Sequence, residues 1–469
     1  MLFLSDKDFM DKDAYIKQLE EENARLKKRI EELEQLLGMN SKNSSKPPSS
    51  DTPGASAVLP KHRRKKHGAK KGHQPYLREL LPPEKVTQRI ELDPEVCPCG
   101  GTDFEKTSEE PLRHQIVDIP PIEPEVIEYI QHIYRCKDCG ELLYQPLPDE
   151  IKRKHFGPGI LALVAVLTGM LNTSKRKALA MINEVFSVPM SLGGLSNCEA
   201  QLADALEHPY NETIEHIRKQ DVAHADETGW RRGNKQRGWL WALCYTGAAA
   251  FMVHARRGQQ AARKLLGKFS GVLVSDRWGG YNFFAGIRQI CWAHLKRDFK
   301  AISEAKGMLG KTGQELYGLA KKILKLRKRV RDGMLQWRTF QNRMAPLMVR
   351  VEDLLEEGAS GKCKLSGKCR NILKHRKHLW TFVKDQSVEP TNNTAERIVR
   401  QGVLWRKSSF GTQSERGARY VERILTVCAT CRLQGRSVIE YLRDACRCHL
   451  DGIAAPSLIK TAGNLAKSA

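Results

Sequence analysis

Residues 14–38 carry a seven-residue repeat of apolar positions, the most regular pattern in the chain. Isoleucine at the first (a) and leucine at the fourth (d) position of each heptad favour a parallel two-stranded coiled coil, and one asparagine at a fixes its register. The pattern therefore predicts a dimeric zipper in residues 1–45, although a helix packed on its own domain has the same periodicity. The a positions are Ile16, Asn23, Ile30 and Leu37, and the d positions are Leu19, Leu26 and Leu33.

Helical spacing returns in residues 158–206, where two apolar segments flank the turn SVPMSLGG. A helix, a Pro- and Gly-containing turn and a second helix predict a helix-turn-helix. Plain helical bundles share this pattern, so both interpretations stay open.

From residue 221 the pattern changes to the short apolar runs of strands. DVAHAD, GWLWALCYT and AAFMVHA predict three strands, QQAARKLLGKF a helix, and GVLVSD a buried strand. This order suits a mixed sheet in which the strand ending at Asp276 lies parallel to the strand ending at Asp226, with a right-handed crossover between them. QICWAHLKRDF predicts a further strand and a turn, and residues 300–385 predict a basic helical insertion.

Three acidic residues follow these elements. Asp226 and Asp276 each end a predicted strand, and Glu396 lies near the start of a predicted helix in NNTAERIVR. Hard cations such as Mg²⁺ prefer oxygen ligands, and two such ions can activate an attacking oxygen and stabilise a leaving one in phosphoryl transfer. The pattern therefore predicts a carboxylate cage for two Mg²⁺ (or Mn²⁺) ions.

The charge balance points to a polyanionic partner. The 469 residues include 78 Lys and Arg against 54 Asp and Glu, a formal charge of +24, and such a surplus favours nucleic acid. Residues 46–95 are rich in Ser and Pro and include KHRRKKHGAKKGH, which predicts a linker that contacts phosphates without reading bases, unless it is only a solvated tail. The predicted phosphate contacts are Lys61, Arg63, Arg64, Lys65 and Lys66.

Four of the thirteen cysteines are spaced as two knuckles of a zinc ribbon, Cys97 with Cys99 and Cys136 with Cys139. The first knuckle has only one residue between its cysteines, so a degenerate ribbon that packs without metal is the alternative. The chain shows no secretory signal, and its longest apolar run is too short to span a bilayer. These features predict reduced thiols and a bacterial cytoplasmic location without membrane contact, close to the nucleoid.

The motifs, taken in order, resemble the DDE transposases of the IS66 insertion-sequence family. SSKPPSSD, the two-knuckle ribbon, DETGW, GVLVSD with GYN, CWAHLKRDF, NNTAERIVR and the RKSSFG run carry the resemblance. It departs in the shortened first knuckle and in SSF after Arg-Lys. The resemblance implies an α/β RNase H-like catalytic core with a helical insertion, in which Asp226, Asp276 and Glu396 are the catalytic triad.

The same resemblance implies roles for further residues and partners. Cys291 and His294 match a Cys-x-x-His motif that supports the site, and a buried cysteine with a packed histidine is the alternative. Arg400, Arg406 and Lys407 fall in a basic stretch that holds phosphates. The implied substrates are the terminal inverted repeats of the element and target DNA. The implied partners are a second copy of the chain, in a homodimer or higher oligomer, and accessory proteins encoded by the element.

A metal-dependent nuclease without strand transfer and a non-catalytic DNA-binding protein are the functions that remain as alternatives to a transposase.

The expected organisation is multidomain. The expected units are a coiled coil (1–45), a basic linker (46–95), a zinc-ribbon-like module (96–148), a helical region (149–215), a catalytic core with an insertion near 300–385 (216–425), and a C-terminal helix and tail (426–469).

Overall fold

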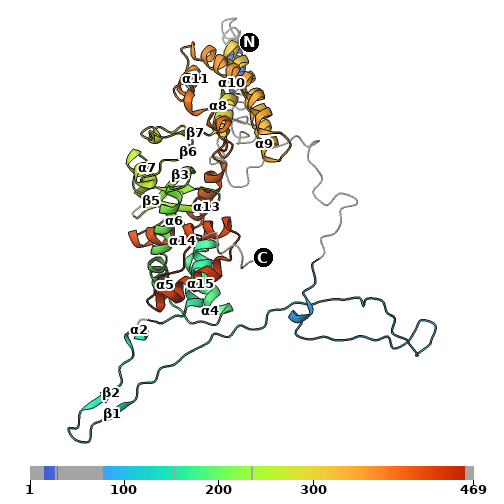
Figure 1. The fold of residues 1–469 in the computed structure, drawn as a ribbon, viewed down its shortest axis with the longest axis vertical. Helices are drawn as coiled ribbons and strands as arrows, with labels where there is room; N and C mark the ends of the chain where they lie inside the picture. Colours follow the sequence, from blue (N-terminus) through green and yellow to red (C-terminus); the bar gives the residue numbers. More distant parts are fainter. Residues whose placement is uncertain (1–14, 27–28, 30–77, 153, 234–235, 460–469) are drawn as a thin grey trace, which may run out of the picture.

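The computed structural model describes residues 15–26, 29, 78–152, 154–233 and 236–459 (Figure 1). Residues 15–26 are helical and exposed along their whole length. Residues 78–148 form an extended arm, and an elongated body of helices and one larger sheet begins at residue 149. Among the described residues, none of the helices combines the length and the apolar character that a membrane span requires.

The arm contains little regular structure. It holds a 3-10 turn, η3 (Pro83–Lys85), and a short antiparallel hairpin of β1 (Ile133–Arg135) and β2 (Leu142–Tyr144), all exposed. The hairpin encloses the second cysteine knuckle, where Cys136 N–H donates to Glu141 O at 2.8 Å. Turn hydrogen bonds and not a hydrophobic core therefore define the local structure of the arm.

The body is built on a five-stranded mixed sheet with the order β5-β4-β3-β6-β7. The central strand β3 pairs antiparallel with β4 and parallel with β6, and β6 pairs parallel with β7. Helix α7 (Gln259–Leu266) connects β5 to β6. The strands are β3 (Val222–Arg232), β4 (Gln236–Cys244), β5 (Ala249–His254), β6 (Val272–Ser275) and β7 (Arg288–Ile290).

Both faces of this sheet are buried, which explains the nearly continuous apolar run of β4. Leu240 and Ala242 belong to a core shared with helices α13 (Asn393–Ser409) and α14 (Glu415–Leu433). Trp241 and Leu243 face the opposite core, which α7 covers. Helix α13 approaches β4 so closely that a Cβ atom at Gly402 would lie 2.0 Å from Leu240 Cδ2, so a larger residue there would require the Leu240 side chain to move.

Helix α14 covers the free edge of β5. The backbone N–H groups of Ala249, Phe251 and Val253 donate to side-chain oxygens of Thr430, Thr426 and Glu422, at 3.1, 3.1 and 2.7 Å. Four helical residues rise about 6.0 Å and two strand residues about 6.6 Å, so polar side chains at every fourth helix position match alternate residues of the edge. The edge is thereby closed to pairing with another chain.

The helices before the sheet share one hydrophobic core with the C-terminal helices. Leu161, Ile182 and Leu202 are fully buried there against Leu425 and Leu442. The N-terminal and C-terminal parts of the body therefore form one packing unit. Its helices are α3 (Pro158–Ala165), the π-helical turn η4 (Val166–Met170), α4 (Lys175–Val185), α5 (Leu192–Ala205), α14 and α15 (Val438–Leu450). The short helix α2 (Asp149–Lys152) precedes this unit, and α6 (Glu207–Arg218) buries Ile214 and Ile217 in the core that α7 covers.

A second helical layer separates the sheet from α13 in sequence and has its own core, which includes Trp292, Phe340 and Phe382. It is anchored to the sheet at β7, where Thr381 Oγ1 donates to Arg288 O at 2.6 Å. Its elements are the 3-10 turn η6 (Arg376–His378) and the helices α8 (Trp292–Ser303), α9 (Gly307–Arg331), α10 (Trp337–Ala359), α11 (Lys364–Leu373) and α12 (Thr381–Lys384). The 3-10 turn η5 (Gly279–Tyr281) lies between β6 and β7, and its Tyr281 is buried in the core that α7 covers.

Three expectations from the sequence need correction. Strand β3 does not end at Asp226 but runs on to Arg232, because β4 pairs with it along its whole second half. The segment predicted as a strand and a turn is a strand followed by a helix, since α8 starts at Trp292 and the insertion therefore begins earlier than residue 300. The division expected between residues 425 and 426 falls inside α14.

Candidate active site

The first two acidic residues lie at the same level on neighbouring parallel strands. Val222 pairs with Val272 and His224 with Val274. Two residues further along each strand lie Asp226 and Asp276, so the register places them opposite each other. Asp226 is within β3, just beyond its parallel pairing with β6, and Asp276 directly follows β6.

The loop after β6 fixes the carboxylate of Asp276. The N–H of Trp278 donates to Asp276 Oδ1 at 2.9 Å, which holds the side chain in a turn typical of aspartate. The buried guanidinium of Arg288 on β7 donates to the backbone oxygen of Asp276 at 3.2 Å and to Ser275 Oγ at 3.1 Å. The side chain of Asp276 is therefore held by its own loop, and its backbone is held by Arg288 on β7.

Glu396 lies in the first turn of α13, and Asn392 sets the position of that turn. The N–H of Glu396 donates to Asn392 O at 3.0 Å. The buried side chain of Asn392 donates to Ala225 O at 2.8 Å and accepts from His224 Nδ1 at 3.2 Å. Burial lowers the pKa of His224 to about 4, so the imidazole is neutral at pH 7 with its proton on the nitrogen that faces Asn392.

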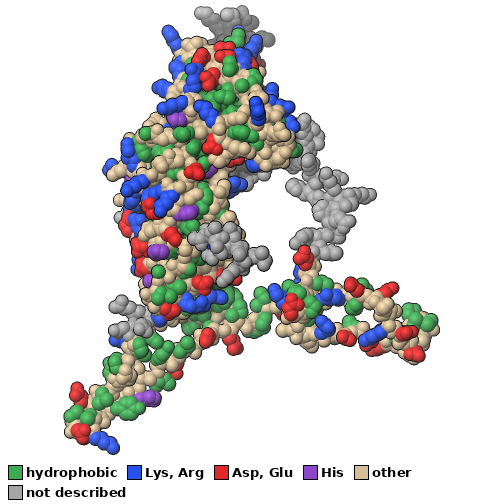
Figure 2. Space-filling model, viewed as in Figure 1, with side chains coloured by type: hydrophobic (Ala, Val, Ile, Leu, Met, Phe, Trp, Pro, Cys, Tyr) green, Lys and Arg blue, Asp and Glu red, His purple; other side chains and the backbone are tan. Residues whose placement is uncertain are grey.

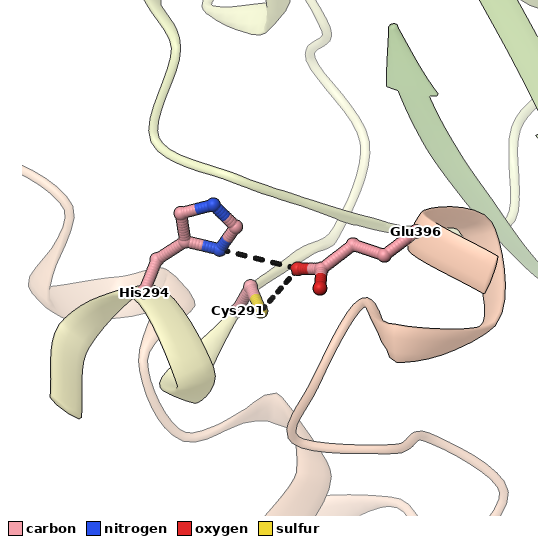
Figure 3. A group of neighbouring side chains, drawn as sticks. All are labelled: Cys291, His294 and Glu396. Carbon is pink, nitrogen blue, oxygen red and sulfur yellow. Dashed lines mark hydrogen bonds and ion pairs between the residues drawn. The ribbon is translucent and has the colours of Figure 1, made fainter. Parts of the chain in front are cut away.

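Cys291 and His294 converge on Glu396 (Figure 3). The Cys291 thiol lies 3.9 Å from Glu396 Oε1 and His294 Nδ1 lies 3.5 Å from the same oxygen. One ligand atom from each of the three residues falls within 4.8 Å of the others. Burial raises the pKa of the Cys291 thiol to about 12 and lowers that of His294, so both are neutral at pH 7. The structure thus brings the Cys-x-x-His motif to the third acidic residue.

The carboxylates are close enough to affect one another. Burial raises the pKa of Asp226 well above its ordinary value, and the charges of Glu227, Asp276 and Glu396 raise it further. A bound cation would favour the ionised form of Asp226, since a nearby opposite charge stabilises a carboxylate. The oxygen donors are those that Mg²⁺ and Mn²⁺ prefer, so the residues present fit a divalent metal.

A fourth acidic residue, Glu227, escaped the sequence analysis. Its side chain is 2% exposed and pairs with Arg257, whose Nη2 lies 2.7 Å from Glu227 Oε1. Tyr281 Oη donates to the other carboxylate oxygen at 2.9 Å. The only sequence signal was the second acid of DETGW, and nothing local indicated its partner Arg257 thirty residues later.

The basic residues that the sequence predicts to contact phosphate differ in their exposure and in their partners. Arg400 and Lys407 are exposed on α13. Arg406 is half-buried and donates to the Gly229 carbonyl of β3, so its guanidinium already has a partner inside the protein. Figure 2 shows further Lys and Arg side chains over the layer of α8 to α11 and along the flank beside the sheet. Lys61, Arg63, Arg64, Lys65 and Lys66 lie outside the described residues.

Each cysteine knuckle has its own local hydrogen bonds, but the two knuckles lie apart from each other. A hydrogen bond between the Cys97 and Cys99 side chains lowers the pKa of Cys99, and backbone N–H groups of the second knuckle lower that of Cys136. Lowered thiol pKa values favour the thiolate that zinc binds. Within the described part of the chain, the four thiols do not gather into one group. Each knuckle thus offers a pair of thiols, and a four-thiolate zinc site would need the arm to bring the two knuckles together.

Two carboxylates at one level of neighbouring parallel strands and a third on a covering helix form an acidic cluster in a mixed α/β protein, and their oxygen donors suit a divalent cation. A family model described as "Transposase IS66 family" matches residues 153–420. The chain belongs to this family, because the match covers more than half of its 469 residues. A model described as the zinc-finger binding domain of transposase IS66 matches residues 94–140, and a family of unknown function matches residues 7–79.

Curated relatives come from Sinorhizobium fredii (strain NBRC 101917 / NGR234) and are named only as uncharacterized proteins. Protein y4qI is 27% identical over 262 residues, 49% of this chain and 48% of that protein, so the alignment spans about half of the relative. Protein y4hP is 26% identical over 423 residues, 78% of this chain and 73% of that protein. Protein y4jD is 22% identical over 386 residues, 76% and 75% of the two chains.

Proposed function

We propose that this chain is a DNA transposase that cuts phosphodiester bonds at the ends of an insertion sequence and joins those ends to target DNA. The single observation that supports this most is the meeting of Asp226, Asp276 and Glu396 in a protein of the IS66 family. The strand order, with β3, β4 and β5 antiparallel in succession and with β6 and β7 parallel to β3, supports an RNase H-like core.

The proposed roles follow from the contacts of each residue. Two Mg²⁺ or Mn²⁺ ions held by the three carboxylates would supply activation of the attacking oxygen and stabilisation of the leaving oxygen. Asp226 and Asp276 present their carboxylates at one level of the sheet, and Glu396 approaches from α13. The Cys291 thiol donates to Glu396 Oε1 and helps to orient this carboxylate, and His294 lies beside the same oxygen; being neutral at pH 7, neither adds charge to it.

Charge-removing substitutions test the triad. Asp226→Asn, Asp276→Asn and Glu396→Gln should each abolish Mg²⁺-dependent cleavage of element-end DNA while DNA binding persists, because the amides keep the shape but lose the charge that holds the metal. Asp221→Asn is the matched control: Asp221 is exposed, precedes β3 and loses the same charge. A triad variant that cleaves as well as the Asp221 variant would have to leave the proposed site.

A nuclease without strand transfer is the second candidate, since the same carboxylates would serve it. Joining of pre-cut element ends to a plasmid separates the two, because only a transposase forms the joined product. A non-catalytic DNA-binding protein would yield neither product. Inverted repeats on both sides of the gene would support the first candidate.

The proposed partners are element-end DNA, target DNA and a second copy of this chain, with accessory proteins from the same element. The exposed apolar seam of residues 15–26 supports pairing of two chains: Ile16, Leu19 and Leu26 are 53%, 42% and 50% exposed. The match of residues 94–140 supports structural zinc bound by Cys97, Cys99, Cys136 and Cys139.

A further inference from the structure

A cleft of about 280 Å³ opens beside the carboxylates, between the sheet and the layer of α8 to α11. Asp276, Arg277 and Trp278 enter it from the loop after β6, and Arg257 enters from the segment after β5. Asp298 on α8 and Asn371 on α11 form the opposite wall. Asp276 lines the cleft and also belongs to the proposed metal site. A ligand in the cleft is therefore adjacent to the bond that is cut.

Arg257 is held rigidly in this cleft. Its guanidinium carbon lies 4.9 Å from the ring centroid of Trp239 and 4.7 Å from that of Trp278, so two aromatic rings hold it. Its Nε and Nη2 atoms lie 2.9 and 2.7 Å from Glu227 Oε1. The side chain is still 36% exposed. An arginine held in place while it faces a cleft is preorganised to bind an anion, since little rotamer entropy remains to be lost.

Arg277 adds a second cation to the cleft. It pairs with Asp298 and donates to Asn371, and its buried Nε atom has no hydrogen-bond partner within the described structure. Lys368 Nζ also pairs with Asp298, at 3.0 Å. Asp298 is therefore shared by two cations and can neutralise only one of them, so Arg277 and Lys368 together keep one positive charge beside Asp276.

We propose that this cleft binds a backbone phosphate of the DNA strand, next to the phosphodiester that is cut, through Arg257 and Arg277. The proposal rests on the proposed function and extends it to the position of the strand. A planar guanidinium suits phosphate oxygens, and arginine and lysine differ in this respect. Glu227, Trp239 and Trp278 are positioning residues, because they act on the DNA only through Arg257.

The test compares three variants of the full-length protein in DNA binding without divalent cations, so that cleavage does not enter the readout. Arg257→Ala removes the guanidinium, Arg257→Lys keeps the charge but loses the fork and the stacking, and Arg256→Ala is the matched control. Arg256 is exposed, adjacent in sequence and outside the cleft. The probes are duplexes of the DNA end that brackets the gene, each with one phosphate near the cut replaced by a neutral methylphosphonate.

Loss of a charge-assisted hydrogen bond predicts that Arg257→Ala weakens binding by about tenfold or more, with Arg257→Lys in between. One methylphosphonate position should weaken binding of the wild type and of Arg256→Ala, but not weaken binding of Arg257→Ala any further. Independent effects of Arg257→Ala and of every methylphosphonate would overturn the proposal and leave Arg257 a purely structural residue. This dependence between the Arg257 variant and one methylphosphonate is measured in binding, not in catalysis. A protein that shows it but has no metal-dependent cleavage would keep the phosphate site and reject the transposase function.

Discussion

The side-chain amide of Asn392 donates to the backbone oxygen of Ala225 at 2.8 Å, which ties the start of α13 to the residue directly before Asp226. Four residues after Asn392 along the helix lies Glu396, whose N–H donates to Asn392 O. The N–H of Asn392 donates to Cys291 Sγ at 3.1 Å. One buried asparagine therefore sets the distance between the acidic residue on the sheet and the one on the helix.

Asn392→Ala should lower both stability and metal-dependent cleavage. It leaves the Ala225 carbonyl and the His224 N–H buried without a partner, which costs about 1–3 kcal/mol of unfolding free energy. The start of α13 is then free to shift, so half-maximal cleavage should need more Mg²⁺. Denaturant unfolding and a Mg²⁺ titration of cleavage measure the two effects.

Asn393→Ala is the control for that variant, since Asn393 is the exposed neighbour in the same Asn-Asn pair. It should change neither quantity. An Asn392 variant that loses stability but keeps the Mg²⁺ dependence of the wild type would show that Asn392 supports the fold and does not position Glu396.

The edge of β5 provides a prediction on the fold alone. Thr426→Val keeps the shape of the side chain but removes the acceptor for Phe251 N–H, which is buried. We expect a loss of about 1–3 kcal/mol in unfolding free energy. Thr246→Val, at an exposed turn, should have almost no effect in the same denaturant series. Equal stability of both variants would show that the contact between α14 and β5 does not depend on these hydrogen bonds.

Glu422, on the same edge, makes stability depend on pH. Burial raises its pKa, although Arg419 and the Val253 N–H act in the opposite direction. In the window between its ordinary and its raised pKa the folded state holds a proton that the unfolded state has released, so stability falls as pH rises through that window. Glu422→Gln has no such proton. Its melting temperature relative to the wild type should therefore rise with pH there, and a difference that stays constant would contradict the raised pKa.

The sequence predicted the strands of the larger sheet because the signal for each strand is local. Alternating and continuous apolar runs indicated the strands, and Asp226 and Asp276 lie next to those runs. The length of β3 was missed because its second half is set by pairing with β4, which side-chain periodicity does not reveal where Glu227 and Thr228 are both polar. The described helices of residues 158–206 were expected, but their packing against α14 and α15 was not.

The sequence indicated candidate site residues only where they stand in a recognisable motif. The three acids and the Cys-x-x-His pair stand in recognisable runs. The structure brings Cys291 and His294 to Glu396, and the strand register places Asp226 level with Asp276. The pairing of Glu227 with Arg257 and the bridging contacts of Asn392 join distant segments, for which the sequence has no local signal. The same limit applies to the knuckles, since spacing indicates the ligands but not how the arm folds.

Zinc is expected at about one ion per chain, because four thiolates complete one tetrahedral site. Cys139→Ser should lower the zinc content and reduce protection of the remaining arm thiols from alkylation. Cys363→Ser is the control, since Cys363 is also exposed but lies at the start of α11. Elemental analysis of gently purified protein measures the content. Absence of zinc in the wild type would show that the shortened first knuckle makes the ribbon degenerate.

The zipper is tested by self-association. Deleting residues 1–40 should reduce the mass seen in sedimentation and the pairing of two element ends, while the body stays folded. Leu26→Ser in the seam should weaken association, because it removes a d-position leucine that is half exposed in the single chain. Arg25→Ser, outside the seam, should not weaken association.

Replacing Asn23 with valine should strengthen association and loosen the choice of oligomer, since the polar a position gives specificity at the expense of stability. A mass distribution that the deletion leaves unchanged would assign this helix to packing within one chain, which is the alternative that its periodicity also allows.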